Sequence, residues 1–260
     1  INYYYSVIIH FIMSNLPINI TFYGSRGAPN PRRVEIFFAE HKLYENQHYQ
    51  YVEINMGKLE HKRGGKYETP NHKVPMIIVE NDPDNNLQKS FKLAESVAIC
   101  RYIEEQLQKK YLFGENPKQR SLIEMWNRRV DLEYFIGAVG KSWIHGPVLK
   151  ALRDARNIKH LPSEFKNGMK LSHSFYREVN DTLSQQNFLA GDSFSIADIS
   201  FLCVFDFASG PVGIKPNWEK LPHLKAWHQR VSKRASVQLH KNPYIKGKER
   251  YGEEKNMSRM

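Results

Sequence analysis

Hydrophobic and polar positions divide this chain into two parts with different periodicities. In the first part, an alternating run at 18–23 predicts a strand with one buried face. Val34, Phe37 and Phe38 then share one face at helical spacing, which predicts a helix at 34–40. Alternation returns at 49–54, so the first elements form a strand–helix–strand unit.

The rest of the first part predicts two more strands and a second helix. We expect strands at 73–79 and 90–93, with a turn at 81–86 between them, and a helix at 97–107. Pro75 begins the first of these strands, and Ser96 is the expected N-cap of the helix. The order βαβ followed by ββα predicts a small α/β thioredoxin-like domain over residues 17–110.

Beyond a predicted linker at 114–117, only helical periodicity remains. The expected helices lie at 118–143, 163–183, 196–207 and 222–237, with a break at Gly146 and Pro147. The helix at 196–207 is almost entirely apolar, so we expect it to be buried, and Ser195 and Asp198 have the spacing of a capping box at its start. These features predict an all-α second domain over residues 118–240.

Both ends of the chain fall outside this pattern. Residues 1–12 precede Met13 and lack the basic region and cleavage site of a signal peptide, and the run is too short to cross a bilayer. We expect Met13 to be the native start and residues 1–12 to be an upstream extension. The polar tail 246–260 is expected to be disordered.

Charge and cysteine content narrow the function classes. The formal charge is +11, but Lys and Arg are scattered among acidic residues rather than clustered, which argues against nucleic acid as a partner. The only cysteines, Cys100 and Cys203, lie far apart without CxxC or metal-type spacing. They indicate buried thiols in a reducing compartment and exclude a cysteine zinc site. No metal and no membrane partner are expected.

The first candidate for chemistry is the polar loop at 24–34. Asn30 followed by Pro31 is a helix-entry signal, so Asn30 is the expected cap of the helix. The loop would then direct helix N–H groups, the positive end of the dipole and an amide at one point, which suits an anion such as a thiolate. An ordinary capped helix explains the same residues.

Four motifs in order resemble those of the cytosolic glutathione transferase family, in particular its bacterial members and fungal relatives. They are APNPRRV at 28–34, KVP at 73–75, LAESVAI at 93–99, and LAGD with SIAD at 189–198. The resemblance covers about residues 17–240. It implies glutathione as co-substrate, a homodimer and a cytoplasmic location.

The resemblance also implies binding roles. Ser96 would hold the γ-glutamyl carboxylate and Glu95 its ammonium, while Lys73 would meet the glycine carboxylate, with His61 or Lys62 as weaker candidates. Val74 would pair with the cysteinyl backbone beside a cis bond to Pro75. An ordinary cap, a surface charge and a strand-entry proline are the alternatives.

The motif at 28–34 departs from the family pattern at the position whose side chain would stabilise the glutathione thiolate. Ala28 stands where many members have a catalytic Ser or Cys, which leaves Asn30, as in nu-class members, and the nearby hydroxyl of Ser25. Fungal relatives use a water held by a Ser and a His of the helical domain. Ser142 and His145 are the candidates here, and Trp143, with Phe135 and Phe207, is a candidate wall of the acceptor pocket.

Three functions follow from the resemblance. The first is conjugation of glutathione to small hydrophobic electrophiles. The second is glutathione-dependent disulfide reduction, as in the nu class. The third is a non-catalytic binding or regulatory module with the same fold, which the missing hydroxyl at Ala28 leaves open.

Overall fold

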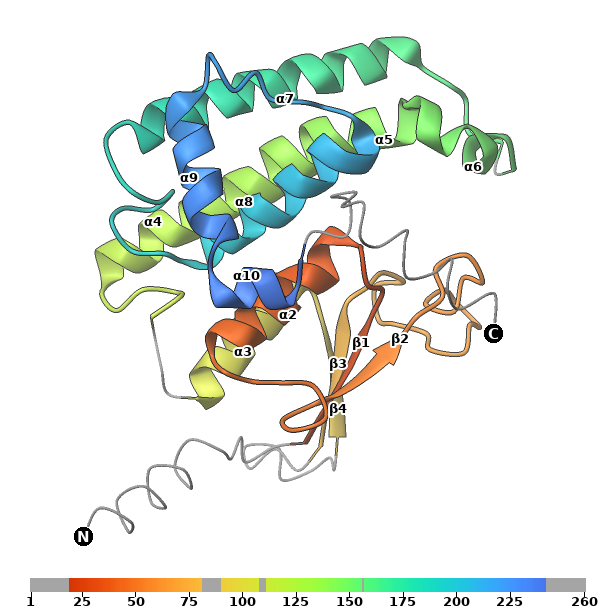
Figure 1. Cartoon of the computed structure of the whole chain (residues 1–260). Helices are drawn as coiled ribbons and strands as arrows, with labels where there is room; N and C mark the ends of the chain where they lie inside the picture. Colours follow the sequence, from red (N-terminus) through yellow and green to blue (C-terminus); the bar gives the residue numbers. More distant parts are fainter. Residues whose placement is uncertain (1–18, 81–89, 108–110, 156, 242–260) are drawn as a thin grey trace, which may run out of the picture.

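The computed structural model describes residues 19–80, 90–107, 111–155 and 157–241. The expectations for residues 1–12, the turn at 81–86 and the tail 246–260 lie outside these ranges. A small sheet with two helices forms one layer, and a set of longer helices forms the other (Figure 1).

The sheet has the mixed four-stranded order β2-β1-β3-β4. Its strands are β1 (Asn19–Gly24), β2 (Gln50–Glu53), β3 (Met76–Glu80) and β4 (Ser90–Ala94). β1 and β2 are parallel and joined through α2 (Pro29–Glu40), while β3 runs antiparallel to both β1 and β4. α3 (Ser96–Gln106) follows β4 and packs against α2. This is the thioredoxin-like arrangement that the sequence predicts.

The second part is entirely helical within the described residues. It contains α4 (Pro117–Arg128), the π-helix η1 (Arg129–Gly140), α5 (Lys141–His145), the 3-10 turn η2 (Pro147–Leu149), α6 (Lys150–Ala155), α7 (Pro162–Leu183), α8 (Ile196–Phe207), the π-helical turn η3 (Ala208–Val212), α9 (Pro222–Ser232) and α10 (Ala235–Leu239). The predicted helix at 118–143 is therefore one helical run with a wide π-helical middle, and it ends before Gly146 as expected. The expected helix at 222–237 is wrong in its last turns, because α10 is separate from α9, and α6 was not anticipated.

Two predicted helix caps are also wrong by one or two residues. The N-cap of α2 is Ala28, so Asn30 lies inside the first turn, because Pro29 already begins the helix. The N-cap of α3 is Glu95, and Ser96 is its first residue. The capping box of Ser195 and Asp198 is confirmed.

The layers meet at α2, which packs against α8 on one side and α3 on the other. Every residue from Pro31 to Ala39 is buried, including two adjacent arginines. Arg32 pairs with Asp206 of α8 at 2.7 Å, and Arg33 pairs with Asp131 of η1 at 2.6 Å. Because a buried charge is stable only when it is paired, these contacts fix how the helical layer sits on α2.

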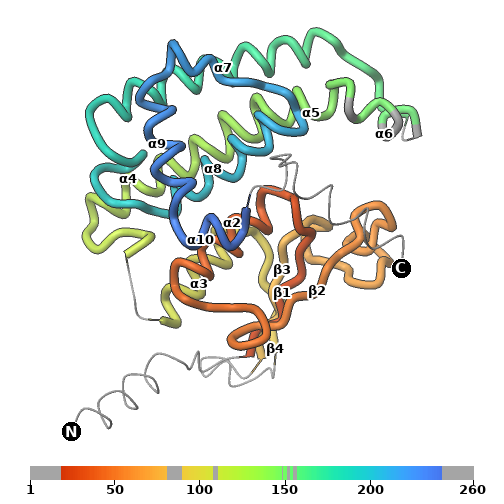
Figure 2. Tube along the Cα trace, viewed as in Figure 1, coloured from red at the N-terminus to blue at the C-terminus, as the bar shows by residue number. Residues whose placement is uncertain are grey.

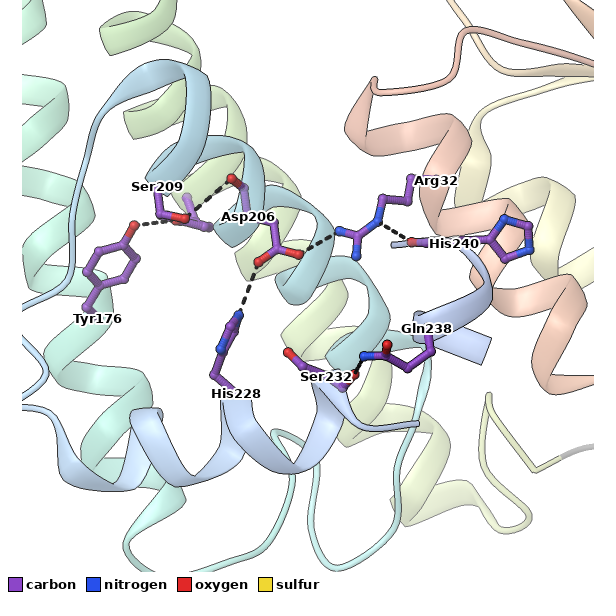
Figure 3. A network of polar contacts seen from close by, with 9 residues as sticks. Arg32, Tyr176, Asp206, Ser209, His228, Ser232, Gln238 and His240 are labelled. Carbon is purple, nitrogen blue, oxygen red and sulfur yellow. Dashed lines mark hydrogen bonds and ion pairs between the residues drawn. The ribbon is translucent and has the colours of Figure 1, made fainter. Parts of the chain in front are cut away.

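The end of the described chain closes over the same helix. α10 lies against α2 (Figure 2), and Arg234 holds Glu40 with two hydrogen bonds of 2.8 and 2.7 Å. Arg32 also donates from Nε to the carbonyl of His240 at 3.0 Å, while its other edge meets Asp206 (Figure 3). The opposite oxygen of Asp206 contacts His228 at 3.1 Å.

α2 also carries a buried carboxyl, that of Glu35, whose Oε1 is 3.7 Å from Nδ1 of His240. Burial is the main reason that the pKa of Glu35 rises from 4.5 to about 7; nearby Glu45 also raises it, and Arg26 lowers it. The pKa of His240 falls from 6.5 to about 4, chiefly because of burial and in smaller part because of Arg26 and Arg32. Folding therefore shifts the two pKa values in opposite directions, and each shift favours the neutral form of its group.

The raised pKa of Glu35 predicts a pH-dependent stability. The contribution of this group is full below its unfolded pKa and is lost as the pH rises through about 7, whereas that of His240 is lost as the pH falls from 6.5 toward 4. Glu35→Gln removes only the first effect. The unfolding free energy of wild type minus that of the variant should fall by about 2–3 kcal/mol between pH 5 and pH 8 in urea titrations. A difference that stays constant over this range would contradict the assignment.

Candidate functional site

The loop between β1 and α2 is a tight turn that places Asn30 at the start of the helix. Gly27 has a φ of 97°, which favours glycine, and the N–H of Ala28 donates to the carbonyl of Ser25 at 3.0 Å. Arg26 donates its backbone N–H to Glu53 of β2 at 3.1 Å, which ties the loop to the sheet. Ser25 and Asn30 are both half-buried.

Asn30 carries most of the available donors at this helix end. Pro29 and Pro31 have no N–H and therefore offer no donor to an anion. The predicted helix start with several free N–H groups is thus wrong at these two positions. Neither the side-chain amide nor the backbone N–H of Asn30 has a hydrogen-bond partner among the described residues. A ligand atom at this point would therefore be met chiefly by Asn30.

A pocket of about 280 Å³ lies at the start of α3, and its polar lining comes from both layers. The charged and hydroxyl groups that line it are Arg33, Glu95, Ser96, Glu124, Arg128 and Asp131. Arg33 donates from Nη1 to the Ser96 hydroxyl at 2.8 Å and from Nη2 to Asp131 at 2.6 Å. The pocket therefore joins α2, α3 and the α4–η1 run.

Glu95 is held in an unusual backbone conformation at the mouth of this pocket. Its φ is 70°, a left-handed value that costs a non-glycine residue about 1–3 kcal/mol and is often found at functional sites. Its Oε1 accepts a hydrogen bond of 2.8 Å from the side-chain amide of Asn71. The strained backbone and Asn71 together fix the carboxylate next to Ser96.

The segment before β3 presents an unpaired backbone edge. The Val74–Pro75 peptide is cis, as expected, and the N–H and C=O of Val74 make no hydrogen bond with the described part of the chain. Lys73 is exposed, and its ammonium has no ion pair with a described residue. The ammonium of Lys62 instead donates to the carbonyl of His72 at 2.9 Å, and His61 is buried, which favours Lys73 over both.

The three candidates from the helical layer have different surroundings. Ser142 is fully buried, donates to the Phe165 carbonyl at 3.3 Å and leaves no room for a Cβ at position 168, so its hydroxyl is engaged between α5 and α7. His145 accepts the N–H of Leu161 on Nδ1 at 3.3 Å and also holds a loop. Within the described residues no hydrogen bond joins either side chain to Asn30, and a water shared by Ser142 and His145 stays a prediction.

Trp143 belongs to an aromatic cluster near the start of α2. Its ring meets that of Phe207 edge to face at 5.0 Å, and Phe135 meets Phe207 at 6.5 Å. Phe207 is the neighbour in sequence of Asp206, which binds Arg32. Arg32 lies two residues after Asn30 on α2. The aromatic cluster is therefore on the α8 side of Asn30, while the pocket at Ser96 is on the α3 side.

Sequence reasoning missed Arg33, Asp131 and Asn71. Arg33 was visible in the motif at 28–34, but its contact with Asp131 spans 98 positions and has no local signal. Burial raises the pKa of the Cys100 and Cys203 thiols, and burial with Tyr67 raises the pKa of Tyr23, so each of these groups favours its neutral form. Among the described residues no group of three or more potential metal ligands occurs, and no helix of these residues has the length and apolar character to span a membrane.

Comparisons with known proteins agree on one family. The family model described as "Glutathione S-transferase, N-terminal domain" matches residues 18–105, and "Glutathione S-transferase, C-terminal domain" matches residues 162–235. The chain is 30% identical over 220 residues to "Glutathione S-transferase 2" of Saccharomyces cerevisiae, with 83% of this chain and 86% of that protein covered. It is 24% identical over 217 residues to "Disulfide-bond oxidoreductase YfcG" of Escherichia coli, with 80% and 88% covered.

Solved structures share the fold. A glutathione S-transferase domain-containing protein of Marinobacter aquaeolei superimposes with a TM-score of 0.70 at 28% identity, covering 84% of this chain and 99% of that one. Gtt2 of Saccharomyces cerevisiae also gives 0.70, at 24% identity, with 85% and 100% covered.

The Arg33–Ser96 contact predicts a specific loss of stability. Ser96→Ala leaves the buried Nη1 of Arg33 without its acceptor, which should lower the free energy of unfolding by about 1–3 kcal/mol in urea titrations. Ser25→Ala is the matched control, because its hydroxyl has no partner in the described residues and its removal should change stability by less than about 0.5 kcal/mol. Equal losses in both variants would count against the contact.

Proposed function

Because the chain belongs to the cytosolic glutathione S-transferase family, we propose that it binds glutathione and conjugates the thiolate to small hydrophobic electrophiles. One observation carries this proposal. Asn30 and Arg33 lie three residues apart on α2, so the free amide donor and the pocket at Ser96 share a face of one helix. One peptide can therefore reach both points.

Glutathione is an extended tripeptide with a charged group at each end, and the site offers a complement for each part. The γ-glutamyl carboxylate lies on the Ser96 N–H and hydroxyl, with its ammonium on Glu95. The unpaired backbone of Val74 pairs with the cysteinyl backbone, beside Pro75, and Lys73 meets the glycine carboxylate. This places the sulfur at the turn of Ala28 and Asn30.

The activation of the thiol requires only a modest free energy. A free thiol has a pKa near 8.5, and lowering it by about two units requires about 2.7 kcal/mol. A charge-assisted hydrogen bond from the Asn30 amide supplies about 1.5–3 kcal/mol, and the dipole of α2 adds about 0.3–1 kcal/mol. Asn30 therefore suffices without a hydroxyl at position 28, and Ser25 is the second candidate donor. The enzyme's remaining contribution is to position the two reactants.

The acceptor substrate lies on the α8 side of the sulfur. Trp143, Phe135 and Phe207 form its aromatic wall, and we assign them to binding small apolar electrophiles. This assignment names a substrate class rather than one compound.

Glutathione-dependent disulfide reduction is the second candidate, because the similar protein YfcG is named a disulfide-bond oxidoreductase. Both Cys100 and Cys203 are buried, so the thiolate of a first glutathione would have to attack the disulfide, and a second would release the mixed disulfide. A non-catalytic glutathione-binding module is the third candidate, supported by Ala28. Binding without either reaction would favour it.

We further propose a cytoplasmic homodimer with no metal, nucleic acid or membrane partner. Met125, Leu132 and Ile136 are spaced along one side of the α4–η1 run and are 44%, 48% and 63% exposed. Such a row of exposed apolar side chains favours contact with a second copy.

Asn30→Ala tests the assignment of the thiol site. Loss of one charge-assisted hydrogen bond should raise the pKa of the bound thiol by about 1–2 units, so kcat/KM at pH 6.5 should fall about 10- to 100-fold. The loss should shrink as the pH rises above 9. Conjugation to a chloronitrobenzene and reduction of a small disulfide are measured in parallel on each protein.

Asn167→Ala, on the exposed surface of α7, is the control and should leave both rates within about twofold. Ser25→Ala separates the two donor candidates. A larger loss in Ser25→Ala than in Asn30→Ala, or equal rates for Asn30→Ala and wild type, would refute the role of Asn30.

A further inference from the structure

The last described residues lie along α2 as a short strap. This strap comprises residues 234–240 and includes α10, which lies beside α2 in Figure 2. Its first anchor is at the last residue of α2, where Glu40 accepts hydrogen bonds of 2.8 and 2.7 Å from Arg234 and a further one from the hydroxyl of Ser236. The Glu40 side chain is only 8% exposed, so solvent screens its charge weakly. One end of the strap is thereby fixed to the end of α2.

The second anchor lies near the start of α2. Arg32 donates from Nε to the carbonyl of His240 at 3.0 Å and from Nη1 to Asp206 of α8 at 2.7 Å (Figure 3). The ring of His240 also lies beside α2, with Nδ1 at 3.7 Å from Oε1 of Glu35. The two anchors are eight residues apart on α2, which is about 12 Å along a helix. The strap therefore runs antiparallel to α2 and holds it near both ends.

Arg32 joins the strap, the helical layer and α2. Its side chain is 4% exposed, and a buried guanidinium needs partners for its charge. The carboxylate of Asp206 meets one nitrogen of the guanidinium and the carbonyl of His240 meets another. Because the guanidinium is a rigid plane, two contacts on different nitrogens fix both its direction and its depth. Asn30 lies two residues before Arg32 on the same helix, so the strap helps to set the position of its amide.

We propose that the strap is a positioning element for the thiol, which acts through Arg32 to hold the amide of Asn30 against the sulfur of glutathione. A hydrogen bond weakens steeply when its donor is misaligned, so a small movement of the first turn of α2 raises the pKa of the bound thiol. Pro29 and Pro31 offer no N–H that could compensate. The inference rests on the proposed binding of glutathione, and it makes thiol activation depend on a segment far from the loop in sequence.

The test measures the pKa of the thiol of bound glutathione, from the ultraviolet absorbance of its thiolate over a series of pH values. Arg32→Lys keeps the charge beside Asp206, but a carbon replaces Nε and the carbonyl of His240 loses its donor. The pKa of the bound thiol should rise by about 0.5–1 unit, so kcat/KM for a chloronitrobenzene at pH 5.5 should fall about 3- to 10-fold.

S-methylglutathione is the reference ligand, because it has no thiol to ionise. Its affinity for Arg32→Lys, measured by isothermal titration calorimetry, should stay within about twofold of the wild-type value. A loss in the thiol pKa and in kcat/KM without a loss in this affinity separates thiol positioning from peptide binding.

A second variant releases the strap at its distant anchor, ten residues from Asn30. Glu40→Gln removes the ion pair with Arg234 and leaves Arg32 in place, and it should raise the pKa of the bound thiol by at least about 0.3 unit. Glu40→Asp keeps the negative charge and should recover about half of that shift or more.

Asn116→Ala is the matched control for a general loss of stability. It removes the N-cap hydrogen bond to Gln119 at the start of α4, which belongs to neither α2 nor the strap. The pKa of the bound thiol should stay within about 0.2 unit of wild type. A shift as large as that of Arg32→Lys would overturn the inference.

The remaining outcomes distinguish the two proposals. If Arg32→Lys and Glu40→Gln leave the thiol pKa at the wild-type value, or if they weaken S-methylglutathione by the same factor as kcat/KM, the strap has only a structural role. The inference is then overturned, while glutathione binding stands. If the wild type binds neither glutathione nor S-methylglutathione at millimolar concentration, the proposed function and the inference both fail.

Discussion

Two adjacent arginines buried in α2 are the interaction on which the arrangement of this protein depends. Arg32 faces the helical layer and meets Asp206, while Arg33 faces α3 and meets Asp131 and Ser96. Both acids come from the helical layer, so α2 cannot leave its place without exposing or unpairing two buried charges. The thiol candidate Asn30 lies on the first turn of the same helix, and its position is therefore set by packing far from the loop itself.

The loss of a hydroxyl at the thiol position has consequences beyond that position. With Ala28 as the cap and prolines on both sides of Asn30, the start of α2 has fewer donors than an ordinary helix end. More of the recognition of glutathione must then come from its ends. In the function we propose, the strained Glu95, its partner Asn71 and the Arg33–Ser96 contact would supply that recognition at the γ-glutamyl end. We therefore infer that the few donors at the proposed thiol site and the well-organised pocket at Ser96 are parts of one arrangement.

Local patterns predicted the elements well and their junctions less well. The alternation at 18–23 and the apolar run at 196–207 specify a strand and a buried helix, because burial periodicity is written in adjacent residues. The predicted caps at Asn30 and Ser96 are two residues and one residue late, since α2 already begins at Pro29 and the left-handed Glu95 is the cap of α3. The pairing of Arg33 with Asp131 could not be predicted, because it depends on how two layers dock. Family motifs single out Glu95, Ser96 and Val74 as candidates, and they did not point to the guanidinium of Arg33 that contacts Ser96.

We infer that one face of α2 binds both the sulfur and, through Ser96, the γ-glutamyl end of glutathione. A crystal structure of the wild-type protein with glutathione tests this most directly. The α-carboxylate should lie within hydrogen-bond distance of the Ser96 N–H and hydroxyl, and the sulfur should lie beside the Asn30 amide. A peptide bound with its glycine end at Ser96, or with its sulfur away from Asn30, would contradict it.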